Sequence, residues 1–304
     1  MDDITQDQLE ILKKKANIIL DASQIDMFCL CPQRFFYRYV LNKGTPVKAS
    51  QLDRGTLVHA GLEVYYKLLQ SGENHRDSLP EAIKHIQKLS VESDSQLEPH
   101  EVGRIIDVIS ENTAHWEVED IGFKIKAVEE PFLYLLFEDD EIRIYISGKI
   151  DLLVDWYTRN SQFENLPIDH KSYDRTYETR RLSNQFLNYS FATNSNYLLV
   201  NKIGFQKTLS VEEKHKRVML SYDPLIKEEW KLNIIKIARQ YINCIAEDSW
   251  PMNFTSCDKF NRKCEYFEIC DSSGKEAKLY KLSANYVDIE PWDVSKALKK
   301  DENI

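Results

Sequence analysis

Apolar residues in the first third of the chain recur at the spacing of helices. Residues 55–70 are the clearest case, because their leucine, valine and tyrosine side chains return every three or four positions. Residues 7–20 predict an earlier helix. A second helix is expected to begin near Ser23 as its N-cap and to continue through Tyr39, with Pro32 compatible with a helix start. Two further, more polar helices are predicted at 79–92 and 99–118.

The pattern changes after residue 118, where apolar runs with strand character begin. Three strands are expected at 123–137, 142–154 and 164–172, followed by a helix at 181–193. Two more strands are expected at 197–206 and 217–222, and then a long helix at 224–247. This alternation predicts an α/β fold with a mixed central sheet and an N-terminal helical portion packed beside it. Four regions are expected: the helical portion at 1–118, the core at 119–250, a cysteine-bearing segment at 251–275 and a polar tail at 276–304.

Composition and charge exclude several classes of protein. Of the 304 residues, 42% are hydrophobic, which is enough for a sizeable core, but no apolar run is long enough to cross a membrane. The net charge of −9 argues against a surface coated with positive charge, although a local basic groove could still meet nucleic acid. The acidic start of the chain resembles no secretory signal, so a cytoplasmic protein is expected. The motifs GxGxxG, GxxxxGK[ST], HExxH and GxSxG do not occur, which argues against common nucleotide-binding loops, zinc proteases and serine hydrolases.

Two carboxylates and a lysine fall on neighbouring predicted strands. Asp151 follows Gly148 on one strand, and Asp169 and Lys171 share a face of the next because alternate residues of a strand project together. Paired carboxylates at strand ends suit a hard cation such as Mg²⁺ or Mn²⁺. A lysine beside them can orient or help to deprotonate a bound water. For an isolated Asp-x-Lys pattern, a surface ion pair would be the better interpretation.

Six cysteines are present, and disulfides are not expected in a chain of this kind. Cys257, Cys264 and Cys270 cluster near the C-terminus with six and then five residues between them, whereas Cys31 lies near the N-terminus. These four thiolates could hold Zn²⁺ or an iron–sulfur cluster, and their spacing alone does not separate the two. Cys244 falls at the edge of an apolar helix face and is interpreted as a packing residue.

Taken in order, these motifs resemble those of the PD-(D/E)XK nuclease superfamily. Gly-x-Ile-Asp ending at Asp151, Ile-Asp-x-Lys ending at Lys171, and the pair Gln185 and Tyr189 correspond to its ordered motif set. The chain looks most like the RecB/AddB branch and the iron–sulfur exonucleases of CRISPR systems and phages. The resemblance runs from about Ser23 to Cys270, which is most of the chain.

Two upstream motifs extend the resemblance. Gly-Thr-Leu-Val-His at 55–59 matches the Gly-x-x-x-His of that branch, and Glu129 matches its glutamate motif better than Glu130 by its spacing to Phe132. The sequence departs from the family at His170, where many relatives carry tyrosine or phenylalanine. This side chain is expected to point away from the catalytic face and is not assigned as a ligand.

The resemblance implies a restriction-endonuclease-like fold and a set of residue roles. The implied metal ligands are His59, Asp151 and Asp169. Lys171 would position the attacking water and stabilise the charge that develops on the phosphate. The supporting residues of the site would be Glu129, Gln185 and Tyr189. His59 also falls outside the apolar arc of its predicted helix, where the alternative is a solvent-facing or structural histidine.

The function implied is that of a metal-dependent DNA nuclease using Mg²⁺ or Mn²⁺. We expect an exonuclease that processes DNA ends, with single strands or free ends as substrate, and with recombination, repair or CRISPR-type proteins as partners. No membrane partner is expected. One alternative is a catalytically silent module that binds DNA or serves in assembly. Another is a zinc-containing protein with no role in nucleic-acid chemistry.

The same resemblance implies a [4Fe–4S] cluster. The family places its first ligand in a Cys-Pro-x-x-Phe/Tyr-x-x-Tyr helix, which Cys31 and the residues after it match, and three more at the C-terminus, here Cys257, Cys264 and Cys270. The six-residue gap between the first two of these is wider than in many relatives. Cys29 is the competing first ligand, but no proline follows it. The cluster is expected to act as a structural staple between two distant parts of the chain.

Five arginines are candidates for contact with DNA. They lie beside aromatic residues or directly after the Asp-x-Lys strand, at Arg34, Arg38, Arg175, Arg180 and Arg181. Such residues can bind phosphates, and neighbouring aromatic rings can stack on bases. In the alternative interpretation the aromatic rings belong to the core and the arginines are ordinary solvated charges.

Overall fold

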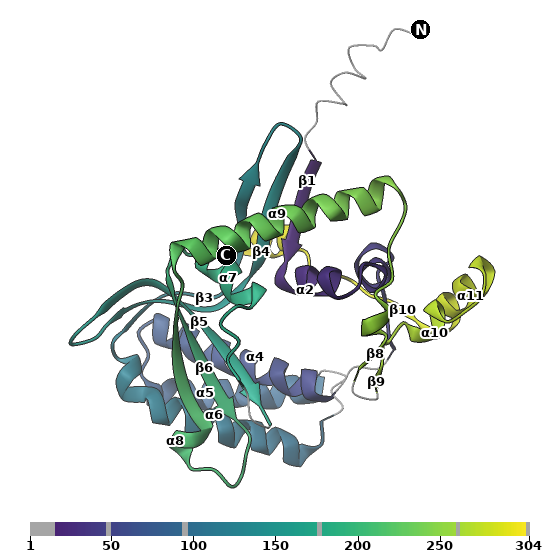
Figure 1. Cartoon of the computed structure of the whole chain (residues 1–304). Helices are drawn as coiled ribbons and strands as arrows, with labels where there is room; N and C mark the ends of the chain where they lie inside the picture. Colours follow the sequence, from purple (N-terminus) through teal and green to yellow (C-terminus); the bar gives the residue numbers. More distant parts are fainter. Residues whose placement is uncertain (1–15, 47–49, 93–96, 175–177, 260–261, 302–304) are drawn as a thin grey trace. The chain divides into compact units, whose positions relative to one another are not determined.

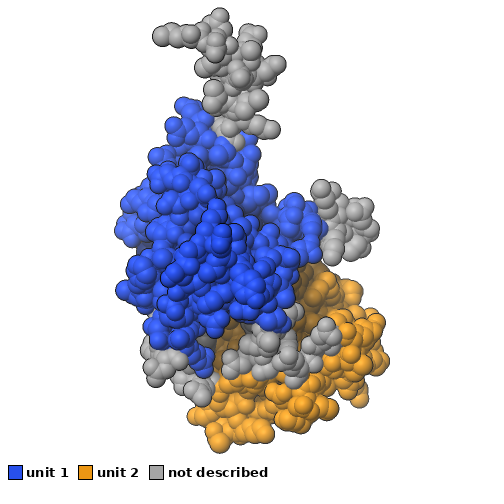
Figure 2. All heavy atoms as spheres, turned by 90° about the vertical axis from the view of Figure 1, so that its right-hand side faces the viewer, with its two compact units in different colours: residues 1–46, 132–148, 225–304 blue, residues 47–131, 149–224 orange. Residues whose placement is uncertain are grey.

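The computed structural model describes residues 16–46, 50–92, 97–174, 178–259 and 262–301. The chain divides into two compact units, which Figure 2 colours separately. Unit 1 comprises 1–46, 132–148 and 225–304, and unit 2 comprises 47–131 and 149–224. Each unit is therefore built from segments that lie far apart in the sequence.

A mixed sheet is the central feature of the described residues (Figure 1). Its strand order is β1-β4-β5-β6-β7, and β3 also pairs with β4. The bounds of these strands are β1 Ala16–Asp21, β3 Phe123–Glu138, β4 Ile142–Tyr157, β5 Gln162–Tyr173, β6 Tyr197–Gly204 and β7 His215–Ser221. The predicted α/β architecture with a mixed sheet flanked by helices is thus confirmed.

Unit 2 holds the second half of β4 and the strands that follow it. β4 pairs antiparallel with β5, β5 pairs parallel with β6, and β6 pairs antiparallel with β7. The long helices α4 (Ser50–Gln70), α5 (His75–Glu92) and α6 (Pro99–Asp120) share one core with these strands. Apolar side chains of β3, β4, β5 and β6 complete this core on the sheet side. The three helices therefore form a layer on the sheet, as the helical spacing of their apolar residues requires.

Close contact between α4 and α5 depends on a glycine. A β-carbon added at Gly61 would lie 2.6 Å from Cδ1 of Ile86 and 3.0 Å from Cδ1 of Ile109. Larger side chains would force these isoleucines, which are fully buried, out of their packed positions. Gly61 thus brings the backbone of α4, which carries His59 two residues earlier, close to the neighbouring helices.

Unit 1 holds the first half of β4, which pairs in parallel with β1. β1 leads into α2 (Ala22–Leu30), the short α3 (Pro32–Phe35) and a π-helical turn at Phe36–Val40. The long helix α9 (Pro224–Ala246) contributes Tyr241 and Cys244 to an aromatic core with Phe28 and Phe35.

The C-terminal elements of unit 1 are short. They are a 3-10 turn at Phe254–Ser256, β8 Asp258–Lys259, β9 Arg262–Lys263, α10 Phe267–Cys270, α11 Lys275–Asn285 and α12 Val294–Asp301. A small antiparallel ladder joins β2 (Lys43–Gly44) to β10 (Val287–Asp288), so segments more than two hundred residues apart in the sequence pair here. Tyr37 and Tyr266 lie in the core of this region.

Two expectations for the start of the chain are wrong, the helix at 7–20 and the N-cap at Ser23. The predicted helix at 7–20 is a strand over its described part, since β1 begins at Ala16 and buries Ile18 and Leu20 in alternation with exposed neighbours. Residues 7–15 lie outside the described residues. The N-cap of α2 is Asp21 rather than Ser23, because the Asp21 side chain accepts from the backbone of Gln24 in a capping box.

The helix predicted through residue 39 is also interrupted. The backbone becomes extended at Cys31, with φ −166° and ψ 109°, and a new helix starts at Pro32, as the proline allows. The later helices and strands lie within a few residues of their predicted bounds. Among the described residues, no helix has both the length and the apolar character needed to cross a membrane.

Candidate active site

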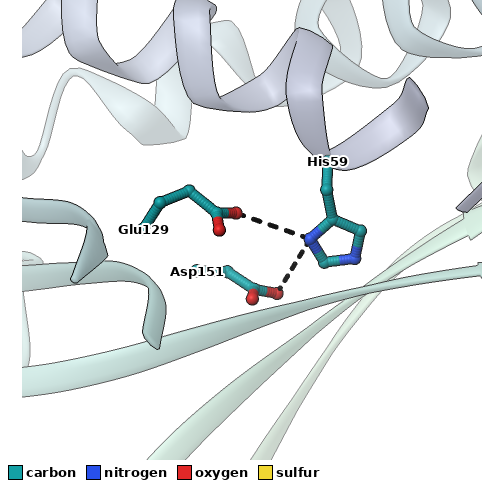
Figure 3. Close-up of side chains that lie close together, drawn as sticks. All are labelled: His59, Glu129 and Asp151. Carbon is teal, nitrogen blue, oxygen red and sulfur yellow. Dashed lines mark ion pairs between the residues drawn. The ribbon is translucent and has the colours of Figure 1, made fainter. Parts of the chain in front are cut away.

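Three ligand-bearing side chains from three elements of unit 2 converge in Figure 3. Nδ1 of His59 on α4 lies 3.6 Å from Oε1 of Glu129 on β3 and 3.5 Å from Oδ2 of Asp151 on β4. One ligand atom of each residue lies within 4.8 Å of the other two. An imidazole nitrogen with two carboxylate oxygens is a donor set that suits a divalent metal ion.

The backbone of Glu129 is in the left-handed region, with φ 55°, inside a long strand. For a residue other than glycine this conformation costs about 1–2 kcal/mol. The Glu129 side chain is only 7% exposed, and its second oxygen pairs with Nζ of Lys149. The neighbouring Glu130 is exposed. The strained backbone therefore aims a glutamate into the cluster, which is the usual setting for strain at a functional site.

A second set of contacts surrounds Asp169 on β5. Asp169 is fully buried, and its Oδ1 accepts from Nζ of Lys171 at 3.1 Å and from Nε2 of Gln185 at 2.9 Å. Lys171 also donates to Oε1 of Gln185 at 2.9 Å. Nζ of Lys171 lies 3.0 Å from Oδ2 of Asp169 too, but outside hydrogen-bond geometry, so this contact is an ion pair only. Lys171 is therefore held at a fixed place by two partners.

Helix α7 (Asn184–Ala192) positions Gln185 and Tyr189 on one face. Ser183 caps this helix by accepting from the backbone N–H of Phe186. Gln185 donates to the Tyr189 hydroxyl at 2.9 Å, and that hydroxyl donates to the backbone carbonyl of Lys149 at 2.7 Å. The helix thus links the Asp169 carboxylate to the strand that carries Asp151.

The backbone of His170 contacts the carboxylate of Asp151. Its N–H donates to Oδ2 of Asp151 at 2.8 Å, which ties β5 to the carboxylate on β4. Its ring is buried, stacks on Tyr66 of α4 at 5.5 Å, and contacts Asn201 through Nδ1 at 3.0 Å. The ring centre lies 6.3 Å from that of His59, and His170 is not among the clustered ligand atoms.

The acidic groups perturb one another. Burial raises the pKa of Asp151 to about 7, with His59 opposing the shift and the charges of Asp169 and Glu129 adding to it. Burial lowers the pKa of His59, but Asp151 and Glu129 outweigh it and raise this pKa to about 9. Glu129 and Asp169 are each paired with a lysine, and Asp151 lies beside His59. A divalent cation held by His59, Glu129 and Asp151 would balance these carboxylates in place of the proton on His59, so the residues present fit a metal ion.

The structure therefore brings all seven predicted site residues into unit 2, with a division among them. Glu129, expected as a supporting residue, joins His59 and Asp151 in the tight group of ligand atoms, whereas Asp169 is in contact with Lys171 and Gln185. Sequence reasoning gave no role to Lys149, which pairs with Glu129. The sequence signal that could have identified Lys149 is its position between Gly148 and Asp151 of the Gly-x-Ile-Asp motif.

The four predicted cluster cysteines all lie in unit 1. Cys31 is buried and the other three are half-buried. The N–H of Asn253 points at Sγ of Cys31 at 3.4 Å, and the N–H of Cys264 donates to the carbonyl of Cys257 at 2.8 Å. Burial raises the pKa of Cys270 to about 11, and the charges of the other three thiols raise it further. The four sulfur atoms therefore share one neighbourhood.

The cysteine sulfurs are less tightly grouped than the ligand atoms of His59, Glu129 and Asp151, because among the described residues no three of them lie within 4.8 Å of one another. Cys29 is exposed, and Cys244 is buried against Phe28 and Phe35, which confirms its interpretation as a packing residue.

Two of the five arginines expected at DNA, Arg34 and Arg181, are engaged within the protein. Arg34 forms a two-pronged pair with Glu265 at 3.0 and 2.7 Å, and Arg181 donates twice to the carbonyl of Ser221. The rings beside Arg34 and Arg38 pack in the cores of unit 1, in accordance with the alternative interpretation. Arg180 is exposed, and Arg175 lies outside the described residues.

The chain was compared with protein families, curated proteins and solved structures. A sequence profile of the PD-(D/E)XK nuclease superfamily matches residues 20–271. No curated protein matches the chain significantly. One similar solved structure is a protein from Eubacterium rectale whose name carries a provisional assignment as an exonuclease, with 10% identity, 98% of each chain covered and a TM-score of 0.43. Another is the protein SSO0001, with 12% identity, 77% of this chain and 80% of that chain covered, and a TM-score of 0.34.

Proposed function

The chain belongs to the PD-(D/E)XK nuclease superfamily, and we propose that it is a divalent-metal-dependent deoxyribonuclease that acts as an exonuclease on DNA ends. The observation that carries this proposal is the convergence of His59, Glu129 and Asp151, whose ligand atoms all lie within 4.8 Å of one another. Lys171 and Asp169 stand beside them in the motif order of the family. Processing of DNA ends in repair or recombination is the setting that the sequence resemblance suggests.

His59, Glu129 and Asp151 would hold the metal ion. Asp169 is a further candidate ligand, because its Oδ2 accepts no hydrogen bond from the described residues. A bound Mg²⁺ or Mn²⁺ supplies Lewis acidity and lowers the pKa of a water. Sites for these ions favour oxygen donors, which the carboxylates of Glu129 and Asp151, and of Asp169 if it binds, would supply.

Lys171 is the residue proposed to act on the reacting groups. Its ammonium is fixed by Asp169 and Gln185, so it can orient a water for attack and place positive charge beside the phosphate as negative charge develops. Gln185 is proposed to position Lys171 and Asp169. Tyr189 supports Gln185 and fixes the backbone of Lys149.

A catalytically silent DNA-binding module is the second candidate function. The gathering of three buried or half-buried carboxylates argues against it, because like charges in one place are costly and a binding module has no use for them. The strained backbone of Glu129 adds to that cost. Both costs are understandable in a site that holds a cation.

A structural [4Fe–4S] cluster bound by Cys31, Cys257, Cys264 and Cys270 is also part of the proposal. The support is the family resemblance together with the shared neighbourhood of the sulfurs, since Cys31 and Cys257 both contact Asn253 and Cys264 and Cys270 pack against one core. Such a cluster would join α3 to the C-terminal segment of unit 1. Metal binding would then stabilise the folded state of this unit.

The test of the proposed activity compares linear and covalently closed DNA. We expect end-labelled linear single or double strands to be degraded with Mg²⁺ or Mn²⁺, and closed circles to stay intact, because an exonuclease needs an end. EDTA should abolish the activity, since the carboxylates cannot approach a phosphodiester without a cation. Undiminished cleavage after rigorous chelation would contradict the metal dependence, and equal cleavage of circles would show an endonuclease instead.

A further inference from the structure

A pocket of about 210 Å³ lies in unit 2 at the end of β5. It is lined by Arg54, His100, Glu101, Arg104, Asp174, Phe205 and Lys207. Three of these side chains are permanently cationic and one is a phenyl ring. This combination is typical of sites that bind a nucleotide, in which cations meet the phosphate and a flat group meets the base.

The guanidinium of Arg54 lies over the ring of Phe205 in the pocket. The guanidinium carbon of Arg54 lies 5.8 Å from the centre of the Phe205 ring. Both terminal nitrogens of Arg54 donate to the carboxylate of Asp174 at 2.8 Å, which fixes the plane of the guanidinium. A fixed guanidinium above a ring offers a stacking surface to a base and tolerates any base identity.

Arg104 keeps an unused donor. Its Nη2 donates to the carbonyl of Phe205 at 3.3 Å, but its buried Nε has no hydrogen-bond partner among the described residues. A buried N–H without an acceptor is costly, so the guanidinium is not fully satisfied within the protein, and the part of Arg104 that lines the pocket can meet a phosphate there. Lys207, which is exposed, adds a second cation at the pocket.

The two acidic residues of the pocket are already occupied. Asp174 accepts from Arg54, and Glu101 accepts from the backbone N–H of Glu98 as part of the capping box of α6. Neither carboxylate therefore competes for the free donor of Arg104. The charge still available to a ligand comes from Arg104 and Lys207, so the pocket favours an anion.

The pocket adjoins the candidate active site along two continuous elements. Arg54 precedes His59 by five residues on α4, or about 7.5 Å along a helix. Asp174 follows Lys171 by three residues at the end of β5, or about 10 Å along a strand. Phe205 is tied to the same place, because its N–H donates to the carbonyl of Tyr173 at 2.9 Å.

We propose that this pocket binds a nucleotide of the DNA strand a short distance from the phosphate that is cleaved. Arg104 and Lys207 hold its phosphate, and the Arg54–Phe205 pair supports its base. The inference rests on the proposed nuclease function for its choice of ligand. A free mononucleotide carries the same chemistry, and the experiment below separates it from a strand.

The test measures binding of a fluorescein-labelled oligothymidylate by anisotropy, in Ca²⁺ and with Lys171→Ala in every protein so that the strand stays intact. The affinity for a single strand falls with salt with a slope of about 0.7 for each phosphate contact. Combining Arg104→Gln with Lys207→Ala should make the slope shallower by about 1.4 and weaken binding roughly 25-fold at about 0.1 M salt, or about 5-fold per contact.

A control variant sharpens the result. Lys88→Ala removes an exposed lysine of the same unit, on α5, and should leave affinity and slope unchanged. A double variant that matches Lys88→Ala in both affinity and slope would overturn the proposal. Thymidine 5′-monophosphate that binds as tightly as the oligonucleotide would overturn the assignment to a strand.

Failure of the nuclease proposal would be visible separately. If protein with Lys171 intact fails to degrade linear DNA in Mg²⁺ or Mn²⁺, the proposed nuclease activity is contradicted. Loss of salt-dependent binding in the double variant would then still support the pocket as a DNA site. Conversely, active protein with unchanged binding in the double variant contradicts the pocket alone.

Discussion

Replacing Lys171 by alanine is expected to lower the rate of DNA cleavage by about 10²–10⁴-fold, the range found when a positioned catalytic group is removed. Its ammonium is the cation that Asp169 and Gln185 hold in place next to the His59–Glu129–Asp151 group. Without it, the water loses its orientation and the phosphate loses a compensating charge. Cleavage of end-labelled DNA under single-turnover conditions measures the effect.

The matched control is Lys126→Ala. Lys126 on β3 pairs with the buried Asp155 at 2.8 Å, so the change also removes a lysine from a buried aspartate of the same unit. Lys126 pairs with Asp155 and not with Lys171 or its partners, so the Lys126→Ala variant should cleave DNA at a near-normal rate. If Lys171→Ala cleaves as fast as Lys126→Ala, the match of Asp169 and Lys171 to the nuclease motif is coincidental.

Protein prepared without oxygen is expected to be brown if it holds the proposed [4Fe–4S] cluster, and replacing Cys31 by alanine should remove this colour and much of the thermal stability. Thiolates at 31, 257, 264 and 270 would bind iron, and binding energy at a site that forms only in the folded chain is folding energy. Alanine at Cys257, Cys264 or Cys270 should have the same effect. Visible absorbance, iron content and the unfolding midpoint measure it.

Cys244→Ala is the control for the cluster, because Cys244 is buried against Phe28 and Phe35 in a separate aromatic core. It should keep colour and iron and lose only packing stability. Cys29→Ala should keep them as well, since Cys29 is exposed. Zinc in place of iron in the purified protein would contradict the cluster and leave the nuclease site unaffected.

Most helices and strands could be predicted from the sequence, and the strand nearest the N-terminus could not. The apolar spacing of 55–70 and the strand runs from 123 to 172 carry their own signal, and both lie where expected. The strand at Ala16–Asp21 was mistaken for a helix because its apolar residues are adjacent in sequence. Only pairing with β4 decides its conformation, and that pairing joins residues more than one hundred positions apart.

The site shows the same limit. Motif order identified His59, Glu129 and Asp151 as neighbours, but not which carboxylate completes the ligand group. That depends on the positive φ of Glu129 and on its pairing with Lys149, neither of which a strand pattern reveals. A charge pattern also cannot show that Arg34 is paired with Glu265.

Binding of Mn²⁺, followed by its paramagnetic resonance signal, tests the central claim most directly, because it reports the metal site without relying on cleavage. We expect the wild-type protein and Lys171→Ala to bind Mn²⁺, since Lys171 is not a ligand. His59→Ala, Glu129→Gln and Asp151→Asn should bind it much more weakly, each having lost a donor atom or a charge. Mn²⁺ binding that is equally strong in wild type and all three of these variants would show that the cluster of His59, Glu129 and Asp151 is not the metal site.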